Sequence, residues 1–98
     1  MARPKKLETA DIQRRLEALD GWSIDDDKLT REFVFGDFNE AFGFMTRAAL
    51  IAEKLDHHPE WFNVYATVRV QLTTHDAAGI SELDFALAAA MDRIAANA

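Results

Sequence analysis

The sequence predicts an α+β domain of two layers, in which an antiparallel sheet of about four strands carries three helices packed on one face. Helical repeats and alternating, strand-like runs follow one another in the order α-β-β-α-β-(β)-α. Strands joined by short turns pair antiparallel, and helices between such hairpins gather on one face of the sheet. A chain of 98 residues forms one hydrophobic core. We therefore expect a single domain over residues 7–98, preceded by a flexible tail over residues 1–6.

The first helix and the first hairpin are predicted from caps, stripes and turns. Thr9 is a candidate helix cap, and Gly21 is a candidate helix end. Residues 22–24 and 30–35 alternate between apolar and polar side chains around an acidic turn at residues 25–27, which indicates a hairpin. The apolar stripe of the helix consists of Ile12, Leu16 and Leu19.

A long helix is predicted from about residue 38 to about residue 56. Asp37 followed by Glu40 resembles a capping box. The apolar arc is wider than one sheet requires, so the helix is either unusually apolar within one core or packed on its sheet and on a partner subunit. We favour packing against a partner subunit, and we expect Phe44 and Ile51 to lie in that interface. The two apolar faces are Phe38, Phe42, Met45, Ala49 and Ala52, and Phe44, Ala48, Ile51 and Leu55.

The last third of the chain predicts a strand and a final helix. Pro59 disfavours helical geometry at His58, so the long helix must end there. An alternating run over residues 64–75 then predicts one long strand. Ser81 with Asp84 resembles another capping box. The stripe of the final helix is Leu83, Leu87, Ala90 and Ile94.

Composition excludes several classes of function. The formal net charge of −6 disfavours direct contact with nucleic acid. There is no cysteine for a disulfide, a thiolate nucleophile or a zinc ligand. No run approaches the length of a membrane span, and no apolar segment follows the basic start of the chain. We expect a cytoplasmic protein that does not bind membranes.

All three histidines lie between positions 57 and 75, namely His57, His58 and His75. Imidazole titrates near neutral pH, which suits it to proton transfer. Alternatively, the three histidines form a surface cluster or have only structural roles. A zinc site formed with Glu53 or Asp56 is less favoured, because the tight ligand spacings of zinc motifs are absent.

Neighbouring residues suggest how such a site would be built. Glu53 and His57 are four apart on the helix, so the carboxylate can orient the imidazole or form an ordinary surface pair. His75 can approach His58 across a cleft wide enough for a flat molecule. Trp61 is a candidate wall or a core residue, and Asp84 is a candidate anchor or only a helix cap.

The spaced elements resemble the signature of the pterin-4a-carbinolamine dehydratase family. The signature elements are Glu53-x-x-x-His57-His58-Pro59, an aromatic residue shortly after, His75 and then Asp84. The stretches Leu72-Thr73-Thr74-His75 and Leu83-Asp84-Phe85-Ala86-Leu87-Ala88 are also similar to that family. The resemblance covers roughly residues 7–94, and no signature position departs from it.

This resemblance implies a hydro-lyase that converts 4a-hydroxytetrahydropterin to quinonoid dihydropterin in tetrahydrobiopterin recycling, with no metal or redox cofactor. By position, His58 and His75 would be the acid/base pair. His57 would bind and polarise the substrate, held by Glu53. Pro59, Trp61 and Asp84 would complete the substrate pocket.

The resemblance also implies assembly and partners. Members of the family form dimers and tetramers, so we expect a homodimer or a homotetramer. An aromatic amino-acid hydroxylase is a candidate partner because its cofactor would be recycled. The alternative function is a helix-mediated protein-binding module. It would be either a dimerisation cofactor of a transcription factor or a partner of a hydroxylase.

Overall fold

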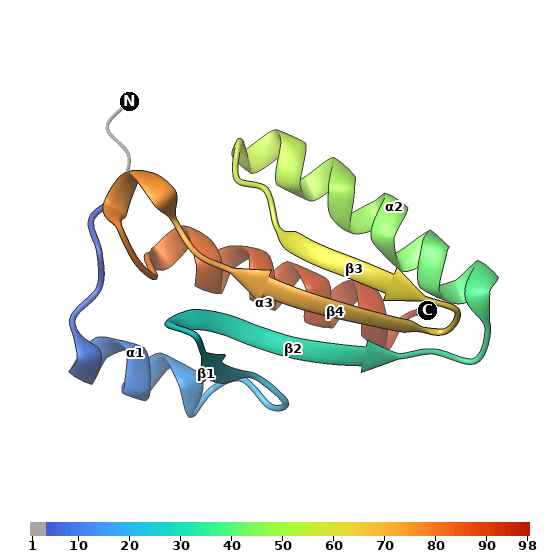
Figure 1. The fold of residues 1–98 in the computed structure, drawn as a ribbon, viewed down its shortest axis with the longest axis horizontal. Coiled ribbons are helices and arrows are strands. Elements are labelled where there is room, and N and C mark those ends of the chain that lie inside the picture. Colours follow the sequence, from blue (N-terminus) through green and yellow to red (C-terminus); the bar gives the residue numbers. More distant parts are fainter. Residues whose placement is uncertain (1–3) are drawn as a thin grey trace.

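The structure, a computed structural model, describes residues 4–98 and confirms an α+β fold. Within the described residues the strands form one antiparallel sheet in the order β1-β2-β4-β3. The elements are α1 (Thr9–Leu16), β1 (Ser23–Asp25), β2 (Lys28–Val34), α2 (Phe38–Leu55), β3 (Glu60–Val64), β4 (Thr67–Leu72), the 3-10 helix η1 (His75–Ala77) and α3 (Glu82–Ala96). The central strands run beside one another along the molecule (Figure 1).

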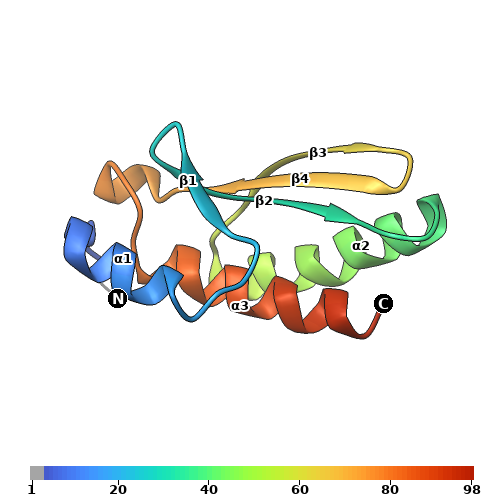
Figure 2. The ribbon, with the colours of Figure 1, turned by 90° about the horizontal axis from the view of Figure 1, so that it is seen from below.

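The sheet forms one layer and the three α-helices form the other, as Figure 2 shows from the side. The core lies between these layers, and its buried side chains come mostly from β2, β4, α2 and α3, with Trp22 just before β1. None of the described helices is long and apolar enough to cross a membrane. The fully buried core side chains include Leu29, Phe44, Val68, Val70, Leu72, Leu87 and Met91.

The first helix differs from the prediction at both ends. Glu8, not Thr9, occupies the cap position, and its side chain makes no capping hydrogen bond. The helix ends at Leu16. Gly21 lies after the turn that follows the helix, and its φ is 85°. Gly21 therefore redirects the chain into β1, which requires the left-handed backbone that glycine adopts easily. Residues 1–3 of the predicted tail lie outside the described residues. Directly after the predicted tail, Leu7 N–H donates to the Ile80 carbonyl at 2.8 Å.

Helix α2 has the predicted start, but its interface face was assigned wrongly. The Asp37 side chain accepts from Glu40 N–H at 2.8 Å, which confirms the cap. Phe44 is fully buried and packs against Phe33 and Phe35 with ring centroids 4.7 and 5.0 Å apart. The face that contains Phe44 therefore covers this subunit's own sheet. The exposed apolar residues of the helix are Phe38, Phe42 and Leu50.

The strand predicted over residues 64–75 is shorter than expected and is the second strand of a hairpin. Strand β3 ends at Val64, and β4 begins at Thr67 as its partner in the register. The Asn63 side chain closes the turn by donating to the carbonyls of Tyr65 and Thr67 at 3.0 and 2.9 Å. Val64 consequently lies 63% exposed, although the alternation had placed it with the buried valines of β4.

Helix α3 begins with the predicted capping box. The Ser81 side chain accepts from Leu83 N–H at 3.2 Å, and the Asp84 side chain accepts from Ser81 N–H at 2.8 Å. These reciprocal contacts satisfy backbone donors that a helix start otherwise leaves unpaired. They also fix Asp84 at the base of the candidate site.

Candidate active site

The three histidines meet at the end of the molecule where α2 stops and η1 begins. A depression of about 180 Å³ is lined by residues from both places. Two of its lining residues, Thr73 and Asp76, were not predicted from the sequence, and Asp56 was considered only as a ligand of the less favoured zinc site. The complete lining is Asp56, His57, His58, Thr73, His75 and Asp76.

The end of α2 explains why His57 and His58 diverge. Asp56 caps the helix in the left-handed conformation, with φ of 51°. This turn lets His57 N–H donate to the Ala52 carbonyl at 3.0 Å and ends the helix before Pro59. As a result, His57 is 5% exposed while His58 projects into solvent. The two rings can therefore perform different tasks.

His57 is held by a buried hydrogen-bond network centred on Asp84. Asp84 Oδ1 lies 2.5 Å from His57 Nε2, and Asp84 Oδ2 accepts from Ser81 N–H and Thr74 Oγ1, each at 2.8 Å. Because a carboxylate only accepts, His57 donates from Nε2, and in the neutral ring Nδ1 is then an acceptor. Thr74 uses its proton on Asp84, so Ser81 Oγ donates to Thr74 Oγ1 at 2.6 Å.

Asp84 is consequently a positioning residue rather than a wall of the depression. Its side chain is fully buried and does not line the depression. The sequence suggested that Asp84 is either a hydrogen-bonding anchor or a helix cap. In the structure it has both roles, because it caps α3 and also holds the His57 ring. Thr74 was missed, and only its position directly before His75 could have drawn attention to it.

Glu53 pairs with His58, not with His57 as the helical spacing suggested. Glu53 Oε1 lies 2.6 Å from His58 Nε2, and both side chains are exposed. The cause is the left-handed turn at Asp56, which takes the following residues off the helical path. Glu53 therefore orients a different imidazole from the one that we expected.

His75 begins η1 rather than ending a strand, and it has a third carboxylate beside it. Glu60 Oε2 lies 3.5 Å from His75 Nε2. The other oxygen of Glu60 accepts from Lys28 Nζ at 2.7 Å. This hydrogen bond raises the pKa of Lys28 above its ordinary value, with the charge of Glu60 acting in the same direction and partial burial opposing it. Glu60 was not among the predicted site residues.

Two predicted pocket residues lie away from the depression. Trp61 is half-buried and packs against the core, and neither it nor Pro59 lines the depression. Among residues 4–98, no group of three or more His, Asp or Glu side chains is arranged to hold a metal ion.

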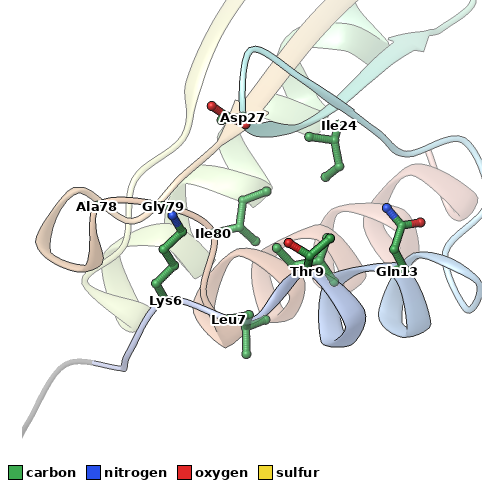
Figure 3. Close-up of a pocket in the computed structure, with 10 residues that line it drawn as sticks. Lys6, Leu7, Thr9, Gln13, Ile24, Asp27, Ala78, Gly79 and Ile80 are labelled. Carbon is green, nitrogen blue, oxygen red and sulfur yellow. The ribbon is translucent and has the colours of Figure 1, made fainter.

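A separate cavity of about 270 Å³ lies between the segment before α1, the β1–β2 turn and the loop after η1 (Figure 3). Lys6, Asp27 and Ile80 reach it from three different segments of the chain. None of the three histidines lines this cavity. The cavity and the depression share no lining residue.

Three imidazoles around one opening, each within 3.5 Å of a carboxylate, are a set of groups suited to acid/base chemistry on a small molecule. The family profile of pterin 4 alpha carbinolamine dehydratase matches residues 5–94. The chain therefore belongs to this family, and the expectation of a dehydratase is confirmed.

Individual relatives agree with the family. The chain is 58% identical over 99 residues to a protein of Chelativorans sp. (strain BNC1) named "Putative pterin-4-alpha-carbinolamine dehydratase", an alignment that covers 99% of this chain and 100% of the relative. A protein of Bradyrhizobium sp. with the same name is 64% identical over 84 residues, which cover 84% of this chain and 85% of the relative.

A solved structure shares the fold. The crystal structure of a transcriptional coactivator/pterin dehydratase from Brucella melitensis superposes with a TM-score of 0.91 at 52% identity. The superposition covers 93% of this chain and 99% of that one.

Proposed function

We propose that this chain dehydrates a 4a-hydroxytetrahydropterin to the quinonoid dihydropterin, as a step in tetrahydropterin recycling in the cytoplasm. The observation that carries the proposal is the meeting of His57, His58 and His75 around one depression, two of them exposed and one fixed from behind. Family membership supplies the substrate class.

The reaction needs two proton transfers. The bond between C4a and the hydroxyl oxygen breaks, and the hydroxyl leaves as water after receiving a proton from an acid. A base removes the N5 proton, and the electrons of the N5–H bond form the double bond between N5 and C4a. His58 and His75 are the acid/base pair in this proposal, because both are exposed on the rim of the depression.

His57 has a different task in this proposal. Its Nε2–H is committed to Asp84, and its ring is nearly buried at the depression. Its Nδ1 can accept a hydrogen bond from a substrate N–H, so His57 orients the ring system between His58 and His75. Asp84, rather than Glu53, holds His57 for this task.

A direct assay tests the proposal. Purified protein should accelerate the loss of water from the carbinolamine, measured as the appearance of quinonoid dihydropterin above the uncatalysed rate. We expect the same rate after dialysis against EDTA, because Asp84 and Glu53 already engage the Nε2 atoms of His57 and His58. Loss of activity with EDTA and its restoration by zinc would refute the metal-free mechanism.

We also propose that the chain assembles into homodimers or homotetramers through α2. Phe38 and Phe42 lie 49% and 55% exposed with ring centroids 5.8 Å apart, next to half-buried Met45 and Ala49. Soluble monomers rarely expose such a patch, and a second copy can cover it with the same residues under two-fold symmetry.

Substitutions at neighbouring positions of α2 separate assembly from folding. Phe42→Lys should dissociate the assembly into folded subunits, because it places a charge in the proposed interface. Phe44→Lys should instead prevent folding, because Phe44 is fully buried in the core. Sedimentation velocity and circular dichroism distinguish these results. A wild-type protein that sediments as a monomer at micromolar concentration would contradict the proposed assembly.

The same α2 face supports the second candidate function, a helix-mediated protein-binding module. The Brucella structure is described as a transcriptional coactivator as well as a pterin dehydratase. For this chain, a transcription factor or an aromatic amino-acid hydroxylase would have to bind at Phe38 and Phe42 in competition with self-assembly. Wild-type turnover of the carbinolamine, with no partner added, favours the enzyme as the primary function.

A further inference from the structure

The three histidines share a feature that the sequence did not reveal: each has a carboxylate at Nε2. The partners are Asp84 at 2.5 Å from His57, Glu53 at 2.6 Å from His58 and Glu60 at 3.5 Å from His75. The first two carboxylates are within hydrogen-bond distance, whereas the third is not. Among the described residues, Glu60 is also the only one of these three carboxylates that contacts a lysine as well as a histidine.

We propose that Glu60 is a positioning residue for His75 and that Lys28 limits its hold on the ring. This proposal rests on the dehydratase function proposed above. With the substrate bound, Glu60 accepts a hydrogen bond from His75 Nε2–H, which fixes the tautomer and turns Nδ1 toward the substrate. Lys28 binds the other oxygen of the same carboxylate, and its positive charge weakens the contact with His75.

The position of Glu60 fits this role. It begins β3 directly after Pro59, and its register partner is Gln71 on β4, close to the point where the chain leaves the sheet for η1. The register therefore places Glu60 near the end of β4 that leads to His75. His75 itself is 83% exposed, so packing does little to hold its ring. A charged partner at 3.5 Å is then a main determinant of where the ring points.

The contact should tighten when the substrate arrives. Hydrogen bonds between catalytic groups are often long in the free enzyme and shorten in the complex. A ligand that covers the depression excludes water, which strengthens the attraction between Glu60 and His75. Lys28 lies on the other oxygen, Oε1, at 2.7 Å, so it can stay bound while Oε2 accepts from His75. Its positive charge nevertheless makes Glu60 a weaker acceptor.

Substitutions with opposite expected effects test the proposal. Glu60→Gln should lower kcat about two- to fivefold with little change in KM, the range that a partly exposed ion pair supports. Lys28→Met should raise kcat up to about twofold, because Glu60 then serves His75 alone. The double variant should match Glu60→Gln, since Lys28 acts only through Glu60. A matched control is Asp25→Asn, which removes the negative charge from the Asp25–Arg69 pair, 2.8 Å apart, and should leave kcat unchanged.

A measurement on the ring itself separates this proposal from the proposed function. The ¹⁵N shifts of a neutral His75 ring report which nitrogen carries the proton. We expect mainly the Nε2–H tautomer in the wild type with a bound pterin, and a mixture in Glu60→Ala. Unchanged tautomers in Glu60→Ala, or equal losses of kcat in Glu60→Gln and Lys28→Met, would overturn the proposal. A tautomer change in a protein without dehydratase activity would support the contact and refute the proposed function.

Discussion

His58→Ala and His75→Ala should each slow carbinolamine turnover by about 10²–10⁴-fold, the range expected when a general acid or base is removed. Both side chains are exposed on the rim of the depression and contribute little to the core. The fold should therefore survive, with thermal unfolding within a few degrees of the wild type. The rate is best measured as enzyme-dependent product formation after subtraction of the uncatalysed dehydration.

A graded series strengthens this result. Glu53→Ala should have a milder effect than His58→Ala, because Glu53 contacts His58 across an exposed pair and acts only by orienting it. Phe62→Ala, at an exposed residue of β3 outside the depression, is a control that should retain the wild-type rate. Wild-type turnover in both histidine variants would show that these residues are bystanders, even within a family of dehydratases.

Elements whose signals are local were predictable from the sequence. The cap at Asp37 and the capping box of Ser81 with Asp84 depend on residues three apart, and both are present. The β3–β4 turn was missed because Tyr65 and Ala66 lack the glycine or asparagine that usually indicates a two-residue turn. The Asn63 side chain, which belongs to β3, closes the turn instead by donating to two backbone carbonyls. No sequence spacing rule predicts this type of turn.

The three histidines of the depression could be singled out from the sequence, but their carboxylate partners could not. The spacing of four residues suggested a Glu53–His57 pair, and a single left-handed residue, Asp56, redirects the contact to His58. The partner of His57 is 27 residues away in sequence. Such a pairing depends on how α2 and α3 pack. Glu60 could not be identified because its relation to His75 depends on the register of β3 on β4.

The largest effect on stability should come from Asp84. In Asp84→Ala, three donors lose their acceptor within a fully buried site, namely Ser81 N–H, Thr74 Oγ1 and His57 Nε2. Removing one partner from a buried network of this kind destabilises a protein by about 3–5 kcal/mol. For a domain of this size the melting temperature should fall by roughly 15–30 °C, which differential scanning calorimetry would measure. A shift of only a few degrees would show that water replaces the carboxylate.

Asp84→Asn separates the stability effect from the effect on the reaction. The Ser81 backbone N–H can only donate, so the amide oxygen of the new side chain must face Ser81 and Thr74, and its NH₂ group must face His57. His57 then has to accept at Nε2 and carry its proton on Nδ1, which reverses the tautomer offered to the substrate. We expect a folded protein whose kcat falls on the order of 10²-fold, by the same logic that makes a tautomer-fixing carboxylate important in other acid/base sites. The ¹⁵N spectrum of His57 should show the switched tautomer. An unswitched ring with the wild-type rate would mean that Asp84 serves only to cap α3.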